Sequence, residues 1–214
     1  SFYQKMNAEN RRTPRDLGEY LHETCEKGVG NIWFDIDLCH YEKNNGGLSD
    51  QELKIASKIR KAMELAHKSA LLYDDVSDLR DDLIRKIVNC VIFYALDNGL
   101  LTQDEIWNDI DTTMLKLERS GALRDVIHLG DLMFLRSIRY LDAIGKADAK
   151  LMDIDGISFA VRVLRAFSMR KWVYREKSLI SFGAMARSFY SQDRLRKSIP
   201  ERLLGYEKVM ESFL

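Results

Sequence analysis

The sequence predicts an all-α protein, a single compact domain of several helices built around one buried helix. Only two prolines and 12 glycines occur in 214 residues, which favours long helices over many short strands. Helix-capping signals recur along the chain, with apolar residues at helical spacing between them. At 46% hydrophobic residues, the chain can bury one sizeable core. We therefore expect a flexible N-terminal segment over residues 1–12 and a single all-α domain over residues 13–214.

The first part of the chain contains two predicted helices and a connector. Thr13-Pro14 reads as an N-cap followed by proline at the first helical position, which predicts a helix over 13–27. Residues 31–41 alternate apolar and polar side chains, but a lone strand is marginal, so we interpret them as an extended or short helical connector. Ser49 with Glu52 forms a capping box, which predicts a helix over 49–73.

The buried helix is predicted over about residues 78–98. Its second half, Ile87–Leu96, has Asn89 as its one clearly polar residue. A helix that is apolar on every side has no face for water and belongs in the core. Asn98-Gly99 closes it, because both residues readily take a left-handed cap.

The rest of the chain is punctuated by further start and stop signals. Thr102 with Glu105 is a second capping box, Ser158 is a candidate N-cap, and Pro200 suits the first position of a last helix. Between Val161 and Phe167, apolar residues are spaced as one helical stripe that includes Leu164 and Phe167 or Ser168. The predicted helices cover residues 102–119, 122–144, 158–177, 179–190 and 200–213.

A cluster of aspartates precedes the apolar run. Asp74, Asp75 and Asp78 are followed by one more aspartate pair, and residues three or four apart share a helix face. Converging carboxylates suit Mg²⁺, which in turn holds a diphosphate, so these three aspartates are candidate metal ligands. The structural alternative is that the acids stabilise the N-terminus of the buried helix, with Ser77 or Asp78 as its N-cap.

The spacing of this cluster carries a family resemblance. Glu64-x-x-His67, followed after six residues by Asp74-Asp75-x-x-Asp78, resembles the first aspartate-rich motif of the trans-prenyl diphosphate synthases. The resemblance implies that Asp74, Asp75 and Asp78 bind Mg²⁺ and an allylic diphosphate. Residues 130–133, GDLM, are similar to the start of a later helix in the same family.

The sequence also departs from that family. Asp81-Asp82 replace the paired arginines that follow the family motif, and the upstream Gly-Lys-x-x-Arg-Pro segment is absent. No second aspartate-rich motif occurs in the remaining chain, so a second acidic wall for a metal cage is missing. These departures favour a structural role for the acids, with a Mg²⁺-dependent enzyme as the alternative.

The histidines offer a second metal hypothesis. Carboxylate-x-x-His is the ligand spacing of di-iron helix bundles, but the two Glu-x-x-His pairs here lie close together for a ferritin-like bundle. We interpret His67, at the rim of an apolar stripe, as a core-edge histidine that is hydrogen-bonded to its own helix. The four pairs are Glu19 and His22, Asp37 and His40, Glu64 and His67, and Asp125 and His128.

Positive charge is concentrated near the C-terminus, although Lys plus Arg and Asp plus Glu are equal at 33 each. Between Arg162 and Lys197 there are ten basic and two acidic residues, an excess of eight, with aromatic residues interleaved. This composition is typical of proteins that bind phosphates and stack bases, or of arginines that solvate one face while aromatics fill the core. The candidate anion-binding residues are Arg162, Arg165, Arg170, Lys171, Arg194, Arg196 and Lys197.

These observations favour a non-enzymatic helical interaction or regulatory protein with a basic C-terminal surface for RNA, DNA or an acidic protein. The alternative is a Mg²⁺-dependent enzyme that acts on a phosphorylated substrate through the Asp74–Asp82 cluster. No apolar run of about 18 residues predicts a membrane span. The three cysteines show no paired spacing, so we expect a reducing, intracellular setting such as the cytoplasm rather than a disulfide framework.

Overall fold

A long helix pair forms the axis of the molecule. The computed structural model describes residues 16–23, 39, 43–44, 46–145, 148, 152–170 and 191–211. Every regular element in those residues is helical, which confirms the predicted all-α class. The elements are α2 (Leu17–Glu23), α4 (Asp50–Ile84), α5 (Cys90–Asp97), α6 (Ile110–Ser120), α7 (Ala122–Asp142), α8 (Ile154–Ser168), α11 (Gln192–Ser198), the 3₁₀ helix η3 (Glu201–Leu203) and α12 (Tyr206–Glu211).

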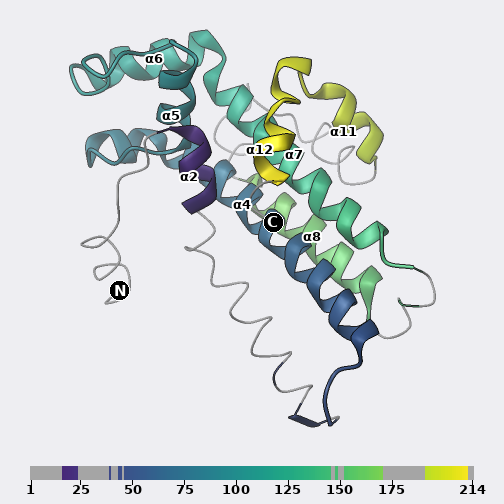
Figure 1. Cartoon of the computed structure of the whole chain (residues 1–214). Coiled ribbons are helices and arrows are strands. Elements are labelled where there is room, and N and C mark those ends of the chain that lie inside the picture. The colour runs from purple at the N-terminus through teal and green to yellow at the C-terminus, as the bar shows by residue number, and fades with distance from the viewer. Residues whose placement is uncertain are drawn as a thin grey trace.

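Helices α4 and α7 make the most extensive contact among the described helices and run antiparallel (Figure 1). Near one end of the pair, Lys58 Nζ donates to the Ala143 carbonyl oxygen over 2.9 Å. Nearer the middle of the pair, Tyr73 Oη donates to Asp131 Oδ1 over 2.7 Å. Because residue numbers rise along α4 as they fall along α7, these two contacts define the antiparallel register.

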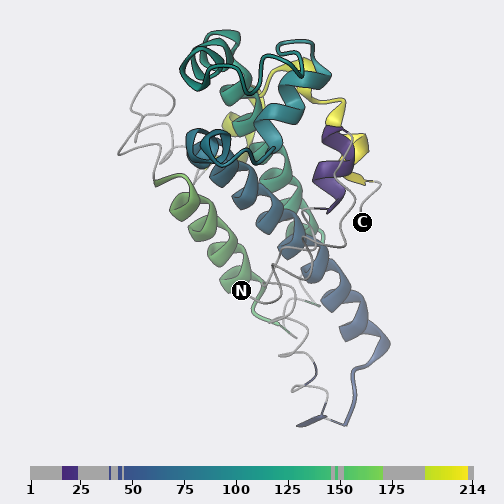
Figure 2. The ribbon, with the colours of Figure 1, turned by 90° about the vertical axis from the view of Figure 1, so that its left-hand side faces the viewer.

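The other helices are arranged around this pair. Helix α8 contacts both α4 and α7 and covers one side of them, while α2 and α12 lie on the opposite side (Figure 2). Helix α5 packs on α2, α4 and α7 at the C-terminal end of α4, next to α6. Helix α11 and η3 pack on α7. The arrangement leaves the outer side of α8 as one boundary of the described part of the chain.

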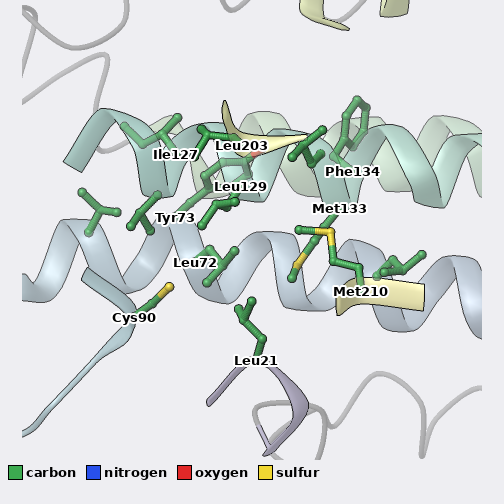
Figure 3. Packing of buried hydrophobic residues seen from close by; sticks show 14 of the residues in the cluster. Leu21, Leu72, Tyr73, Cys90, Ile127, Leu129, Met133, Phe134, Leu203 and Met210 are labelled. Carbon is green, nitrogen blue, oxygen red and sulfur yellow. The ribbon is translucent and has the colours of Figure 1, made fainter. Parts of the chain in front are cut away.

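The core is continuous across these contacts. Figure 3 shows Leu72 and Tyr73 of α4 beneath Leu129 and Met133 of α7, with Leu21 of α2 on the other side of α4. All five are at most 1% exposed. Burial of such side chains contributes on the order of 1.5–3 kcal/mol each, so the α4–α7 seam supplies much of the stability.

The predicted buried helix is present, with different bounds. The aspartate-rich stretch belongs to the last turns of α4, which ends at Ile84. Lys86 then takes a left-handed conformation with φ 56°, and Ile87 N donates to the Asp82 carbonyl over 2.8 Å, which closes α4 as a Schellman-type end. The buried helix is α5, whose residues from Cys90 to Ala95 are all buried, and Asn89 is its N-cap rather than a polar residue in its middle.

Other predicted bounds vary in accuracy. The Ser49–Glu52 capping box is confirmed, but its helix continues past residue 73. Helix α7 closely matches the predicted 122–144. The Thr102–Glu105 contact forms, yet it closes a turn, and α6 begins later with Asp109 as its N-cap. Asp153, not Ser158, caps α8, because Gly156 leaves room for the carboxylate of Asp153 to accept the Gly156 N–H.

Several predictions fall on parts of the chain that the structure does not describe. They concern the flexible segment over 1–12, the Thr13-Pro14 start, the connector over 31–41 apart from Cys39, and the helix over 179–190. The last predicted helix, 200–213, is divided into η3 and α12. Within the described ranges, no helix is both long enough and apolar enough to cross a bilayer.

Candidate functional site

The aspartate cluster lies on the last turns of α4, and one of its members joins three helices. Asp75 Oδ2 accepts a hydrogen bond from Tyr20 Oη at 2.7 Å and one from Cys90 N at 3.0 Å. It therefore satisfies a backbone N–H at the N-terminus of α5, where a carboxylate is electrostatically favoured. Burial, with the Asp75 carboxylate as a further cause, raises the pKa of the Tyr20 hydroxyl well above its ordinary value. The hydroxyl is therefore protonated and donates.

Asn89 completes this junction. Its Nδ2 donates to Asp82 Oδ2 at 2.9 Å and to the Asp75 carbonyl at 3.0 Å, while its Oδ1 accepts from Val91 N at 3.1 Å. The structural alternative for the acids is thus partly right. Asp75 does accept a hydrogen bond at a helix N-terminus, but that N-terminus belongs to α5. The predicted N-caps Ser77 and Asp78 lie inside α4.

The predicted metal ligands are not gathered into a metal site. Asp74 is exposed and Asp78 is half-buried one turn later, whereas Asp75 points to the α2–α5 junction. In the described part of the chain, no group of three or more His, Cys, Asp or Glu residues is placed to hold a metal ion. The Mg²⁺ hypothesis for Asp74, Asp75 and Asp78 stays a prediction.

A buried ion pair lies at the centre of the α4, α7 and α8 contacts. Arg165 Nη2 donates to Asp131 Oδ1 at 2.6 Å, and the two residues are 5% and 3% exposed. Arg165 Nε lies 3.2 Å from both Asp131 Oδ1 and the hydroxyl of Tyr73. The ring of Phe134 stands 5.1 Å from the guanidinium carbon. A charged residue of α8 therefore lies in the core, held by partners on both other helices.

The electrostatics of this network explain its charge state. Burial alone would raise the pKa of the Asp131 carboxyl, but the Arg165 charge and hydrogen bonds from its neighbours outweigh it and leave the pKa below its ordinary value. Burial, reinforced by Asp131, raises the pKa of the Tyr73 hydroxyl far above its ordinary value. Gly130 allows the approach, because a Cβ there would lie 2.7 Å from the Tyr73 ring. We infer a structural ion pair that fixes the α4–α7–α8 register.

A third tyrosine–aspartate contact holds the C-terminal elements on α7. Tyr94 Oη of α5 donates to Asp125 Oδ2 of α7 at 2.8 Å, and Arg202 Nη2 of η3 donates to Asp125 Oδ1 at 2.6 Å. Asp125 is 5% exposed. The predicted carboxylate-x-x-His pair of Asp125 and His128 is therefore divided: Asp125 serves Tyr94 and Arg202, while His128 Nδ1 lies 3.6 Å from Asp131 Oδ2.

His67 lies at the edge of the core, as expected, whereas the expected hydrogen bond to its own helix stays a prediction. It is half-buried on α4, and burial lowers its pKa. Its Nε2 is buried without a hydrogen-bond partner in the described part of the chain. No set of metal ligands forms around it among the described residues.

The predicted basic surface is divided by the fold. Arg165 is in the core, so its prediction as an exposed anion-binding residue is wrong. Arg162 is half-buried on α8, and Arg170 is exposed two residues after α8 ends. Arg194 and Lys197 are exposed on α11, which packs on α7, and Arg196 Nη1 is 2.6 Å from Glu207 Oε1 of α12. Lys171 lies outside the described residues.

The outer side of α8 carries exposed apolar side chains that do not pack in the core. Phe159, Val163 and Phe167 are 60%, 44% and 57% exposed and follow one another at four-residue spacing, so they form one stripe. Arg162 flanks the stripe, and the guanidinium of Arg170 stacks 3.5 Å from the Phe167 ring centre. We call these five residues the α8 face.

The exposed position of Phe167 differs from the stripe that was predicted for this helix. Phe167 or Ser168 was expected beside Val161 and Leu164 on the buried side. Phe167 is exposed and Ser168 is half-buried, and the buried side is centred on Val161, Arg165 and Met169. These three also have four-residue spacing. The Arg165–Asp131 pair sets this rotation, because turning Phe167 inward would expose the arginine and leave the aspartate unpaired.

Comparisons with known proteins give no relative. No family model matches the chain, and neither a curated protein nor a solved structure matches it.

Proposed function

We propose that this chain is a non-enzymatic helical interaction protein that binds an acidic protein partner through the α8 face. The observation that carries the proposal is the exposed stripe of Phe159, Val163 and Phe167 with arginines beside it. Contiguous exposed apolar side chains rimmed by polar residues mark interaction sites. Aromatic residues and arginine are also the types enriched at the centres of interfaces.

The composition of the α8 face favours a protein over a nucleic acid. Among the described residues of α8 and the turn after it, Arg165 is buried, so the arginines beside the stripe are Arg162 on α8 and Arg170 just past its end. Binding to nucleic acid depends on neutralising several phosphates. Val163, at the middle of the stripe, has no π-system on which a base could stack. A helix with apolar side chains at matching intervals and acidic neighbours would fit both the stripe and the arginines. The intracellular setting expected from the cysteines stays a prediction.

The test uses three fluorescently labelled ligands in anisotropy titrations. The first is an acidic helical peptide with apolar residues at four-residue spacing, the second is a scrambled peptide of the same composition, and the third is a single-stranded RNA. We expect binding of the first peptide alone. Val163→Ser should abolish this binding. Leu115→Ser is the matched control, because Leu115 has the same exposed fraction of 44% but lies on α6, outside the α8 face, and it should leave binding unchanged.

Three other results would contradict the proposal. Binding of RNA that is lost in Arg162→Glu and Arg170→Glu would replace the protein partner by a nucleic acid. Equal binding of the ordered and scrambled peptides would reduce the interaction to net charge. Absence of binding to all three ligands, with no self-association through the same face, would reject the α8 face as a binding surface.

A further inference from the structure

We propose that Asn98, at the C-terminal end of α5, is a modification site that loses its side-chain amide by spontaneous deamidation. The reaction passes through a cyclic imide closed by the Gly99 nitrogen when the end of α5 opens, and its co-reactant is water. The inference is independent of the proposed function of α8. It is carried by the Asn-Gly pair, by the hydrogen bonds at the end of α5 and by the attachment of α2 to the neighbouring residue.

The chemistry of an Asn-Gly pair favours this reaction, because glycine has no Cβ to hinder the attacking nitrogen. The Gly99 nitrogen loses its proton and forms a bond to Cγ of Asn98. The bond from Cγ to Nδ2 breaks, and ammonia leaves with that proton. Water then opens the imide at either carbonyl, which gives aspartate or isoaspartate. Water is consumed and ammonia is released, and nothing is oxidised or reduced.

The two reacting residues are accessible to water. Asn98 and Gly99 are both exposed, and Gly99 takes a left-handed conformation with φ 64°. Apart from its chain neighbours, no described residue lies within 4 Å of the position that a Cβ on Gly99 would occupy. The space around the attacking nitrogen is therefore open.

The closed end of α5 nevertheless holds the reacting atoms apart. Asn98 has ψ 7°, so the Gly99 nitrogen nearly eclipses the Asn98 nitrogen, whereas ring closure requires it to eclipse Cβ. Gly99 N also donates to the Leu96 carbonyl at 3.0 Å, and Asn98 Nδ2 donates to the Tyr94 carbonyl at 2.8 Å. The reaction breaks both hydrogen bonds, so it takes place only in molecules whose last α5 turn has opened locally.

Opening of this turn is coupled to the docking of α2. Asp97, directly before the reacting residue, accepts a hydrogen bond from Leu17 N of α2 at 2.9 Å. Tyr20 of α2 lies with its ring 5.2 Å from that of Phe93 in α5, and its hydroxyl donates to Asp75 of α4. A change that loosens α2 therefore releases a constraint on the end of α5 and raises the fraction of open, reactive molecules.

The product opposes closure of the same turn. An aspartate carboxylate has no N–H to donate to the Tyr94 carbonyl, and negative charge at the C-terminal end of a helix is electrostatically unfavourable. Isoaspartate also lengthens the main chain by a carbon atom, which displaces Leu100 N from its 2.7 Å hydrogen bond to the Ala95 carbonyl. Deamidation therefore keeps open the turn whose opening allowed it.

Peptide mapping by mass spectrometry over a time course measures the reaction, with an isoaspartate-specific methyltransferase to quantify the isomer. A synthetic peptide of residues 94–103 gives the rate without the helix. Asn98 in the folded chain should react at least about tenfold more slowly than in the peptide, because two net hydrogen bonds must open. The rate should rise with pH, because the Gly99 nitrogen must lose its proton. Asn98→Gln should stay intact over the same time, because its longer side chain closes a larger ring.

Two variants that loosen α2 should accelerate the reaction. Asp97→Ala removes the hydrogen bond to α2, and Tyr20→Phe removes a hydroxyl contact near the other end of α5. Each should raise the rate about three- to tenfold, the effect of one net hydrogen bond. Asp111→Ala is the matched control, because it truncates an exposed aspartate of α6, and it should leave the rate unchanged. Asn45-Gly46, the other Asn-Gly pair of the sequence, is followed in the same digest and should keep its rate.

Four results would overturn parts of this inference. If Asn98 stays intact in every folded variant after the peptide has converted, it is not a modification site. A folded rate equal to that of the peptide, or one that neither Asp97→Ala nor Tyr20→Phe changes, rejects the coupling to α2. Parallel acceleration at Asn45 and Asn98 replaces local opening by general unfolding. Hydrogen exchange of the α2 amides should be faster in the deamidated chain, and unchanged exchange would show that the product does not keep the turn open.

Discussion

Replacing Arg165 by methionine should strongly destabilise the protein, although the basic segment around this residue predicts an exposed side chain. The substitution leaves the carboxylate of Asp131 buried at 3% exposure without its ionic partner. Removing one partner of a buried pair costs about 3–5 kcal/mol. A domain of this kind is stable by only about 5–15 kcal/mol in total, so the variant should lie near the edge of folding.

The pH dependence should change sign in the variant. In the parent chain the pKa of Asp131 is lowered, so its contribution to the free energy of unfolding is present above the ordinary carboxyl pKa and is lost as pH falls through the folded value. In Arg165→Met, burial should raise the pKa of Asp131 above the unfolded value. The carboxylate then destabilises the fold at neutral pH, and lowering the pH toward about 5 should recover part of the loss.

Urea unfolding followed by far-ultraviolet circular dichroism measures both effects. Arg170→Met is the matched control, because it makes the same change at an exposed position just past the end of α8 and should shift stability by less than about 0.5 kcal/mol. The double variant Asp131→Leu with Arg165→Met should be more stable than Arg165→Met alone. A loss below about 1 kcal/mol for Arg165→Met, or one that grows as the pH is lowered, would refute the buried-pair assignment.

The helix junctions and the aspartate cluster yield four further predictions. Asp75→Ala should cost about 2–4 kcal/mol in urea unfolding, because it leaves two buried donors unpaired, whereas the exposed Asp74→Ala should be nearly neutral. Gly130→Ala should lower the melting temperature, at a cost of about 1–3 kcal/mol, because its methyl group meets the Tyr73 ring; an unchanged value would contradict that contact. Lys86→Gly should raise stability by up to about 1 kcal/mol, because φ 56° strains a non-glycine residue; a loss would argue against the left-handed helix end. Calorimetric titration of Mg²⁺, with and without diphosphate, should give no saturable heat, and heat that disappears in Asp74→Ala would favour the enzyme hypothesis.

Local signals in the sequence predicted the fold class and some helix ends. The Ser49–Glu52 capping box depends on residues three positions apart, and both of its hydrogen bonds form. Helix α7 lies between Gly121, which is left-handed at φ 82°, and the turn after Asp142. Such features need no information about distant parts of the chain, which is why sequence patterns report them.

The remaining features depend on contacts between distant residues. Asp75 and Cys90 meet because α4 closes and the chain turns back at Lys86, and no residue in that turn is a glycine or proline that would have marked it. The sequence did contain a signal that Arg165 is buried. This residue lies four residues after Val161 and four before Met169, both buried, and a charge in the middle of an apolar stripe predicts a buried partner rather than an exposed surface.

The conspicuous acids of this chain are explained by the way its helices are joined. Three aspartates each accept a hydrogen bond from a tyrosine on another helix, and in sequence the partners lie between 31 and 58 residues apart. Short motifs contain the acids without their partners, which is why such motifs suggest ligands or catalytic groups. The pairs are Tyr20 with Asp75 at 2.7 Å, Tyr73 with Asp131 at 2.7 Å and Tyr94 with Asp125 at 2.8 Å. Helix packing accounts for these acids. The functional hypothesis therefore rests on the exposed apolar side chains of α8, which do not pack in the core.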